Sequence, residues 1–269
     1  MVSSIEEFVM KIALIGYGKM GHLIEEIALQ QGHTIIAILP SSEAVSSLKE
    51  NLIQQVDICI DFSAPQAVLS NLQRLAPFKK NIVMGTTGWE EHLDEVKKLI
   101  HEHQIGFLFS PNFSVGVHLF KNIVEAAAQL MNEFEDYDVA GQELHHYQKK
   151  DSPSGTAKSL VSILLEKIQR KKNPLYDRVD RPIAPHELNF SSVRCGSIPG
   201  THTIIFDSPA DTLTITHQAR NREGFARGAL AAAEWLIGKK GIFTLEDMIC
   251  SSKNISNTCH LPGNNYNET

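Results

Sequence analysis

Two imidazoles, several ammonium groups and a helix-starting motif stand together in one short segment. Residues 143–157 read ELHHYQKKDSPSGTA and include His145, His146 and Lys149. Imidazole and ammonium groups can donate a proton once burial or neighbouring charge has tuned their pKa. The Pro-Ser-Gly-Thr that follows is typical of a helix start, where free N–H groups suit a carboxylate, and we assign Gly155 and Thr156 to that role. The segment therefore predicts a site that binds and protonates an anionic substrate.

Two other interpretations of this segment remain open. It could be a solvated basic turn ahead of a well-capped helix, which is common in proteins. A metal site at His145 and His146 is less favoured, because no carboxylate or cysteine stands at helical ligand spacing from the pair. We therefore predict no metal.

A glycine motif near the N-terminus is the second candidate for chemistry. Gly16-Tyr17-Gly18-Lys19-Met20-Gly21 fits the GxGxxG pattern, directly after an apolar run and before an apolar pattern with helical spacing. Such a turn lets the backbone approach a pyrophosphate at a helix N-terminus. We predict dinucleotide binding by the three glycines with Lys19 and Met20, against the alternative of a plain packing turn.

The preference between the two nicotinamide dinucleotides depends on the end of the second predicted strand. An acid there usually binds the ribose of NAD, whereas a basic residue accommodates the phosphate of NADP. This chain has Leu39-Pro40-Ser41-Ser42, with no acid at that place and no basic residue before Lys49. The hydroxyl of Ser41 favours NADPH slightly, and NADH stays the alternative.

Two further loops and one arginine complete the candidate residues. Gly85-Thr86-Thr87-Gly88 and Ser110-Pro111-Asn112-Phe113-Ser114 each follow a predicted strand, at the sheet edge that binds ligands in doubly wound folds. We assign Gly85, Thr86, Thr87, Asn112 and Phe113 to the cofactor, although each loop could be an ordinary turn. Arg222 could grip a carboxylate through its planar guanidinium, although exposed arginines before helices are usually only surface.

Two different patterns of elements must position these residues. Apolar runs at 11–15, 34–39, 56–62, 81–84 and 105–109 alternate with helical patterns. This alternation predicts an α/β fold, a Rossmann-type doubly wound parallel sheet. After residue 117, a long helix is followed by strands at 137–144, 188–195, 202–207 and 213–217, which predict a second α+β domain with an open mixed sheet. We place the dinucleotide-binding domain at 1–114 and 223–269, and the substrate-binding and oligomerisation domain at 115–222.

The bulk composition excludes several classes of protein. The 269 residues are 42% hydrophobic, and the formal net charge is -6, which argues against a nucleic-acid or anionic-membrane binder. Four cysteines without a CxxC pair, and no signal peptide or membrane span, favour a reduced cytoplasmic setting. The segments 1–9 and about 252–269 are expected to be disordered.

With these residues in view, the chain resembles the dihydrodipicolinate reductase (4-hydroxy-tetrahydrodipicolinate reductase) family from about Lys11 to Met248. The most specific match is Glu143-x-His145-His146-x-x-Lys149-x-Asp151-x-Pro153-Ser154-Gly155-Thr156-Ala157. Shorter matches support it: Asp61-Phe62-Ser63, Gly85-Thr86-Thr87-Gly88, Asn112-Phe113-Ser114-Val115-Gly116-Val117 and Arg194-x-Gly196-x-x-Gly200-x-His202-Thr203.

The resemblance implies an oxidoreductase of the diaminopimelate and lysine biosynthesis pathway. It implies that a hydride passes from NADPH or NADH to a cyclic imine dicarboxylate, and that a protein acid completes the reduction. Lys149 looks like the proton donor, and His145 like its partner or its competitor for that role. His146, Gly155, Thr156 and Arg222 would hold the substrate carboxylates. The resemblance also implies a homotetramer formed through the second domain.

Two other functions share part of this pattern. A dehydrogenase of the aspartate or homoserine type would keep the cofactor fold but should lack His-His-x-x-Lys before Pro-Ser-Gly-Thr. A non-enzymatic NAD(P)-sensing domain would keep the glycine motif and have no reason for clustered proton donors. The segment 143–157 argues against both.

Overall fold

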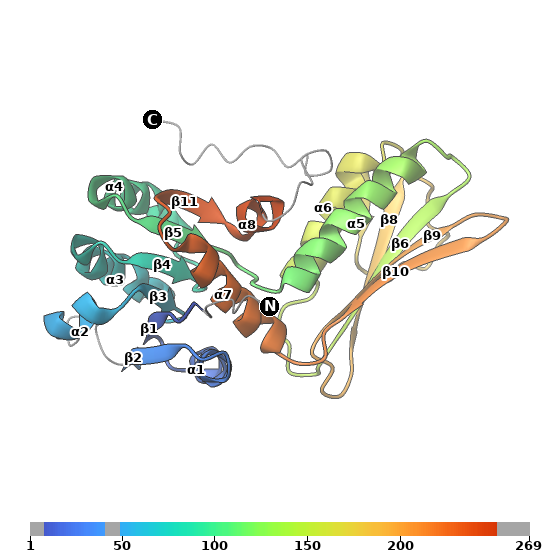
Figure 1. Ribbon diagram of the computed structural model, residues 1–269. Coiled ribbons are helices and arrows are strands. Elements are labelled where there is room, and N and C mark those ends of the chain that lie inside the picture. The colour runs from blue at the N-terminus through green and yellow to red at the C-terminus, as the bar shows by residue number, and fades with distance from the viewer. Residues whose placement is uncertain (1–7, 41–48, 252–269) are drawn as a thin grey trace, which may run out of the picture. The chain divides into compact units, whose positions relative to one another are not determined.

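The structure is a computed structural model, and it describes residues 8–40 and 49–251. The chain divides into two compact units. Unit 1 consists of Met1–Val115 and Glu223–Thr269, and unit 2 of Gly116–Arg222. Figure 1 labels the elements of both units.

Unit 1 is built on a six-stranded sheet in the order β11-β5-β4-β3-β1-β2, and every neighbouring pair of strands is parallel. The first strand has β2 on one side and β3 on the other, so the strand order reverses beside it. In doubly wound sheets, ligands bind at such a switch point, beyond the carboxyl ends of the strands. The strands are β1 (Lys11–Ile15), β2 (Thr34–Leu39), β3 (Ile58–Asp61), β4 (Asn81–Met84), β5 (Gly106–Phe109) and β11 (Gly241–Thr244).

Helices cover both faces of this sheet, because its strands are apolar on both sides. Ile12 and Leu14 pack into one core, and Ala13 and Ile15 into the other. The first core includes residues of α1 (Lys19–Gln30), α7 (Glu223–Leu236) and α8 (Leu245–Ser251). The second includes residues of α2 (Glu50–Gln55), α3 (Val68–Leu75) and α4 (Leu93–His103). Short 3-10 turns lie at Pro65–Ala67, Ala76–Phe78 and Glu90–His92.

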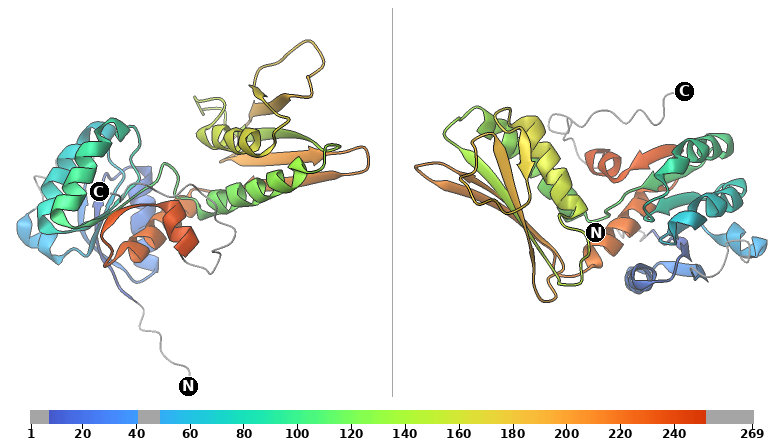
Figure 2. Two further views of the ribbon diagram at one scale, coloured as in Figure 1. Left: turned by 90° about the horizontal axis from the view of Figure 1, so that it is seen from above. Right: turned by 180° about the vertical axis from the view of Figure 1, so that it is seen from behind.

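Unit 2 has a five-stranded mixed sheet in the order β10-β9-β6-β8-β7. Strand β9 runs antiparallel to β10 and β6, and β8 runs parallel to β6 and β7. Helices α5 (Val115–Asn132) and α6 (Gly155–Lys167) cover the same face of the sheet, and their apolar residues share one core with the strands (Figure 2). The strands are β6 (Asp138–His145), β7 (Asn173–Leu175), β8 (Glu187–Arg194), β9 (Thr201–Asp207) and β10 (Thr212–Gln218).

The predicted fold class is confirmed, with a parallel sheet covered on both faces and a second, mixed sheet. Strand β11, helix α8 and the short strand β7 were not predicted from the sequence. The predicted disorder at 252–269 and most of that at 1–9 lies outside the described residues. No helix in the described part of the chain is both long and apolar enough to cross a membrane.

The packing of α7 against the loop after β5 depends on a glycine. A Cβ atom built on Gly228 would lie 1.7 Å from the carbonyl oxygen of Phe113, so no side chain fits there without a shift of the backbone. Gly224, one turn earlier on the same helix, has its nearest neighbour at 3.5 Å, which is an ordinary contact. Only the first of these two glycines is required by packing.

We therefore expect Gly228→Ala to lower the free energy of unfolding by about 1–3 kcal/mol, because it overpacks the contact with Phe113. Gly224→Ala should leave stability unchanged or raise it by up to about 1 kcal/mol, since alanine favours the helix. Urea denaturation of both variants measures the difference. Equal effects at the two positions would contradict the packing role of Gly228.

Candidate active site

The turn between β1 and α1 has the backbone that a dinucleotide requires. Gly16 has a φ of +84°, and a Cβ atom on it would lie 2.3 Å from the carbonyl oxygen of Phe62. A Cβ on Gly21 would lie 2.5 Å from the carbonyl oxygen of Gly16. A Cβ on Gly18 would meet nothing within 4 Å, so the space over this residue is open to a ligand. The first and third glycines close the turn, and the second leaves the cradle that a pyrophosphate would fill.

A buried carboxylate organises the loops beside this turn. Asp61, at the end of β3, is fully buried and accepts hydrogen bonds from the backbone N–H of Ser63 (2.8 Å), Asn71 Nδ2 (2.9 Å) and Thr86 Oγ1 (3.2 Å). Burial raises the pKa of Asp61, and these hydrogen bonds partly oppose the shift. Asp61 thereby ties the loop after β3 to the Gly85–Gly88 loop after β4.

A hollow of about 360 Å³ lies at this edge of unit 1. It brings the glycine turn together with the predicted loop after β4, and its lining residues are Gly18, Lys19, Met20, Phe62, Ser63, Pro65, Gly85, Thr86 and Thr87. The ring of Phe62 lies against Gly85, which has no side chain. A Cβ atom on Gly85 would lie 2.2 Å from this ring. The position after the parallel strands and the bare backbone of Gly18 fit a nicotinamide dinucleotide.

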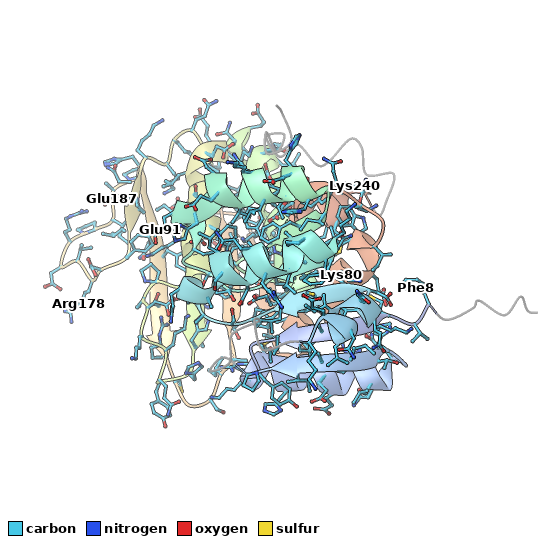
Figure 3. The ribbon with its side chains drawn as sticks, turned by 90° about the vertical axis from the view of Figure 1, so that its left-hand side faces the viewer. Phe8, Lys80, Glu91, Arg178, Glu187 and Lys240 are labelled. Carbon is cyan, nitrogen blue, oxygen red and sulfur yellow. The ribbon has the colours of Figure 1, made fainter. Side chains whose placement is uncertain are left out.

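A larger hollow of about 540 Å³ lies at the opposite, amino ends of the same strands. Its lining includes Lys80 and Lys240, which are labelled in Figure 3. Doubly wound sheets bind their ligands at the carboxyl ends of the strands. We therefore do not assign the cofactor to this larger hollow.

Two of the predicted cofactor side chains, those of Asn112 and Phe113, do not line the hollow at the carboxyl ends. Phe113 is 2% exposed, and its ring packs 5.8 Å from that of Phe62 inside the core. Asn112 Oδ1 accepts a hydrogen bond from the backbone N–H of Ser114 (2.8 Å), so it shapes its own loop. Ser41 lies outside the described residues. Contact of these three side chains with the cofactor remains a prediction.

The second cluster belongs to unit 2 and is centred on Glu143, which is fully buried on β6. Its Oε1 atom accepts hydrogen bonds from Ser192 Oγ (2.8 Å), the backbone N–H of Ser154 (3.0 Å) and Arg194 Nη2 (3.1 Å). Its Oε2 atom lies 3.4 Å from His145 Nδ1 and 3.5 Å from His202 Nε2. These donors hold the pKa of Glu143 well below its usual range despite burial, so the carboxylate is ionised.

The environment of His145 keeps its imidazole neutral. Burial lowers the pKa of His145 to about 4, and His202, Lys149 and Arg194 add to the shift, while Glu143 opposes it. At neutral pH, His145 therefore carries a single ring proton. As a candidate proton donor, His145 is therefore a neutral imidazole, whereas Lys149 offers an ammonium group.

Lys149 lies on the loop that follows β6, with its side chain 22% exposed. Its ammonium group donates to Asp151 Oδ1 at 2.7 Å, and this interaction lowers the pKa of Asp151. Arg194 joins the loop to the buried cluster, because its Nη2 atom also donates to the carbonyl oxygen of Asp151 (2.7 Å). The loop of Lys149 is thus attached to the carboxylate of Glu143 through Arg194.

Helix α6 begins where the sequence predicts. Ser154 is its N-cap, and its hydroxyl accepts a hydrogen bond from the backbone N–H of Ala157. Gly155 and Thr156 form the first turn, where helix N–H groups have no partner within the helix. His146 is half-buried, and Arg222 is exposed at the end of unit 2.

Glu143, His145 and His202 each offer an atom within 4.8 Å of the others, a spacing that could hold a metal ion. The pair of possible metal ligands considered from the sequence, and not favoured there, was instead His145 with His146. The carboxylate of Glu143 already binds the guanidinium of Arg194, which balances its charge. We therefore interpret the cluster as a hydrogen-bonded charge network.

Asp61, Glu143, Arg194 and His202 lie in these clusters and were not among the predicted site residues. All four stood in the motifs that carry the family resemblance. Their position in these motifs was the one feature of the sequence that pointed to them, because no local pattern assigns a role to any of the four. The structure supplies the reason for their presence, since each takes part in a network of buried hydrogen bonds or ion pairs.

Comparison with known proteins agrees with this geometry. The model of the dihydrodipicolinate reductase N-terminus matches residues 10–113, and that of the C-terminus matches residues 116–249. A protein from Christiangramia forsetii named 4-hydroxy-tetrahydrodipicolinate reductase is 38% identical over 240 residues, which cover 89% of this chain and 98% of that protein. One of the same name from Staphylococcus carnosus is 34% identical over 252 residues, with 89% and 99% covered.

Among solved structures, dipicolinate-bound dihydrodipicolinate reductase from Paenisporosarcina sp. TG-14 shares the fold, with a TM-score of 0.70. It is 22% identical, and the match covers 88% of this chain and 98% of that one. The fold and the glycine turn define a two-unit oxidoreductase with a Rossmann-type nucleotide-binding unit. Within this class, the chain belongs to the dihydrodipicolinate reductase family.

The low pKa of His145 leads to a prediction for stability. An unfolded histidine titrates near pH 6.5, whereas folded His145 titrates near pH 4, so acid protonates the unfolded state first. Stability should therefore fall as the pH drops below about 6.5. Between pH 7 and pH 5, the free energy of unfolding should therefore fall by about 2 kcal/mol less in His145→Gln than in the unchanged protein.

Chemical denaturation at pH 5, 6 and 7 tests this expectation. His101→Gln, at an exposed position of α4, serves as the control and should retain the pH dependence of the unchanged protein. A His145→Gln profile parallel to that of the control would show that burial does not lower the pKa of His145.

Proposed function

We propose that this protein catalyses the NAD(P)H-dependent reduction named by its relatives, converting 4-hydroxy-tetrahydrodipicolinate, or its dihydrodipicolinate form, to tetrahydrodipicolinate in diaminopimelate and lysine biosynthesis. The observation that carries the proposal is the cluster of His145, Lys149 and the start of α6, in a chain whose family match spans residues 10–113 and 116–249. A nucleotide-binding unit joined to a site with cations and free helix amides suits a reductase of an anionic substrate.

The cofactor would bind at the carboxyl edge of the sheet in unit 1. The backbone of Gly16, Gly18 and Gly21 would hold its pyrophosphate, and Gly85 and Thr87 would approach its nicotinamide half. When bound, the reduced nicotinamide supplies the hydride. We propose NADPH as the preferred cofactor, because no acid ends β2 to bind an unphosphorylated ribose.

Lys149 is the proton donor in this proposal. Its ammonium group forms an ion pair with Asp151 on the exposed side of the cluster, whereas burial lowers the pKa of His145 and keeps that ring neutral, which favours Lys149 over His145 as the donor. His145 then acts beside it as a hydrogen-bonding partner of the substrate.

The two substrate carboxylates require separate positive partners. The N–H groups of Gly155 and Thr156 would receive one of them, aided by the positive end of the 13-residue helix α6. His146 and Arg222 complete the set, since a guanidinium can bind a carboxylate through two hydrogen bonds. Unit 2 is thus proposed as the substrate-binding and oligomerisation domain of a cytoplasmic homotetramer.

A coupled assay tests the activity and the proton donor together. Dihydrodipicolinate synthase, pyruvate and aspartate semialdehyde generate the substrate, and absorbance at 340 nm follows NADPH and NADH in parallel. We expect oxidation that requires the synthase and is faster with NADPH. Lys149→Ala should lower kcat by about 100-fold to 10,000-fold, the usual contribution of a general acid, with cofactor affinity unchanged.

The matched control is Lys150→Ala, which removes the neighbouring, exposed ammonium. It should retain activity if the effect belongs to Lys149 and not to the charge of the loop. Absence of oxidation by a folded protein that binds nucleotide would overturn the proposed reaction. Full activity of Lys149→Ala would leave the reaction in place and transfer the proton donation to another group.

A further inference from the structure

The fully buried carboxylate of Glu143 connects four elements of unit 2. Glu143 lies on β6, Ser192 and Arg194 on β8, His202 on β9, and Ser154 caps α6. The interactions divide between the two carboxylate oxygens. Oε1 accepts three hydrogen bonds from Ser154, Ser192 and Arg194, whereas Oε2 lies within 3.5 Å of two imidazoles, those of His145 and His202.

The Oε2 side determines the state of His145. Oε2 of Glu143 and Nδ1 of His145 are both inaccessible to solvent, and neither makes a hydrogen bond of conventional geometry with any described residue, including each other. They lie 3.4 Å apart. A lone pair on Nδ1 would repel the ionised oxygen, whereas a proton there would be attracted to it. The contact therefore favours the tautomer of His145 that carries its proton on Nδ1.

The other ring nitrogen of His145 is then an acceptor. A Cβ atom built on Gly200 would lie 3.1 Å from Nε2, so the glycine leaves room on that side of the ring. Burial and the charges of His202, Lys149 and Arg194 lower the pKa of His145, so its ring is neutral. The charge of Glu143 opposes this shift. A neutral ring carries one proton, on either Nδ1 or Nε2.

We propose that Glu143 is a positioning residue that fixes His145 in the Nδ1–H tautomer, so that a bare Nε2 atom is presented as a hydrogen-bond acceptor beside Gly200. His145 therefore receives a hydrogen bond in the reaction and Lys149 gives the proton. This role in catalysis rests on the proposed reductase function. The tautomer itself does not, and it can be measured in the free protein.

A single substitution should reverse the tautomer. In Glu143→Gln, the carbonyl oxygen of the amide would take the place of Oε1, because three donors converge there. The NH₂ group would then point at Nδ1 of His145 and require that nitrogen to accept. Ser192→Ala is the matched control, since it removes one donor to Oε1 and leaves the charged Oε2 facing the ring.

The experiment is ¹⁵N NMR of the histidine-labelled full-length protein at pH 7.5, with the His145 signals identified by their loss in His145→Gln. We expect a protonated Nδ1 and an unprotonated Nε2 in the unchanged protein and in Ser192→Ala, and the opposite pattern in Glu143→Gln. A protonated Nε2 in the unchanged protein would overturn the proposal even if Glu143→Gln failed to fold. So would an unaltered tautomer in a folded Glu143→Gln.

Kinetics separate positioning from a structural role. With the wrong tautomer imposed, kcat of Glu143→Gln should fall about 100-fold or more, while the KM for the cofactor stays unchanged. An unchanged kcat with a reversed tautomer would overturn the catalytic part of the proposal. If the unchanged protein did not reduce the substrate, the proposed function would fail, and the NMR result would still decide the tautomer.

Discussion

A fully buried negative charge is the constraint on which the structure of unit 2 depends. A carboxylate removed from water is costly unless donors and opposite charge surround it. Around Glu143, those partners come from strands β8 and β9 and from the cap of helix α6. The hydrogen bonds and ion pairs of Glu143 therefore position His145 and the start of α6. They also position the loop of Lys149, because Arg194 binds both Glu143 and this loop. The candidate catalytic residues are held by the requirement to satisfy a residue that does no chemistry itself.

In the nucleotide-binding unit, a different buried acid, Asp61, likewise positions the loops around it. Asp61 accepts hydrogen bonds from Ser63 and Thr86, so the loops after β3 and β4 keep a fixed relation. The backbone of Phe62 lies close to Gly16 of the glycine turn, and its ring lies close to Gly85 in the loop after β4. In both units, loops carry the proposed ligand-binding groups, and a buried carboxylate at the end of a strand or near it positions these loops.

The sequence predicted the fold class and most strands, because buried parallel strands are continuous apolar runs. The runs at 11–15, 34–39 and 81–84 coincide with β1, β2 and β4. Strand β11 was missed because its sequence, Gly-Ile-Phe-Thr, is not a continuous apolar run, and its place comes from pairing with β5. The role of Glu143 was equally out of reach, since its partners Ser192 and Arg194 are 49 and 51 residues away. Local patterns predict elements and caps, whereas a charge network depends on contacts that only the folded chain creates.

A double-mutant cycle measures directly whether Glu143 and Arg194 act as one unit. The free energy of unfolding is compared among the unchanged protein, Glu143→Gln, Arg194→Met and the double variant. Arg194→Met leaves the buried carboxylate without its guanidinium partner, and Glu143→Gln removes the charge that this guanidinium balances. The two effects should therefore not add, and we expect a coupling energy of about 2 kcal/mol. Effects that add to within about 0.5 kcal/mol would contradict the dependence of this site on the buried carboxylate.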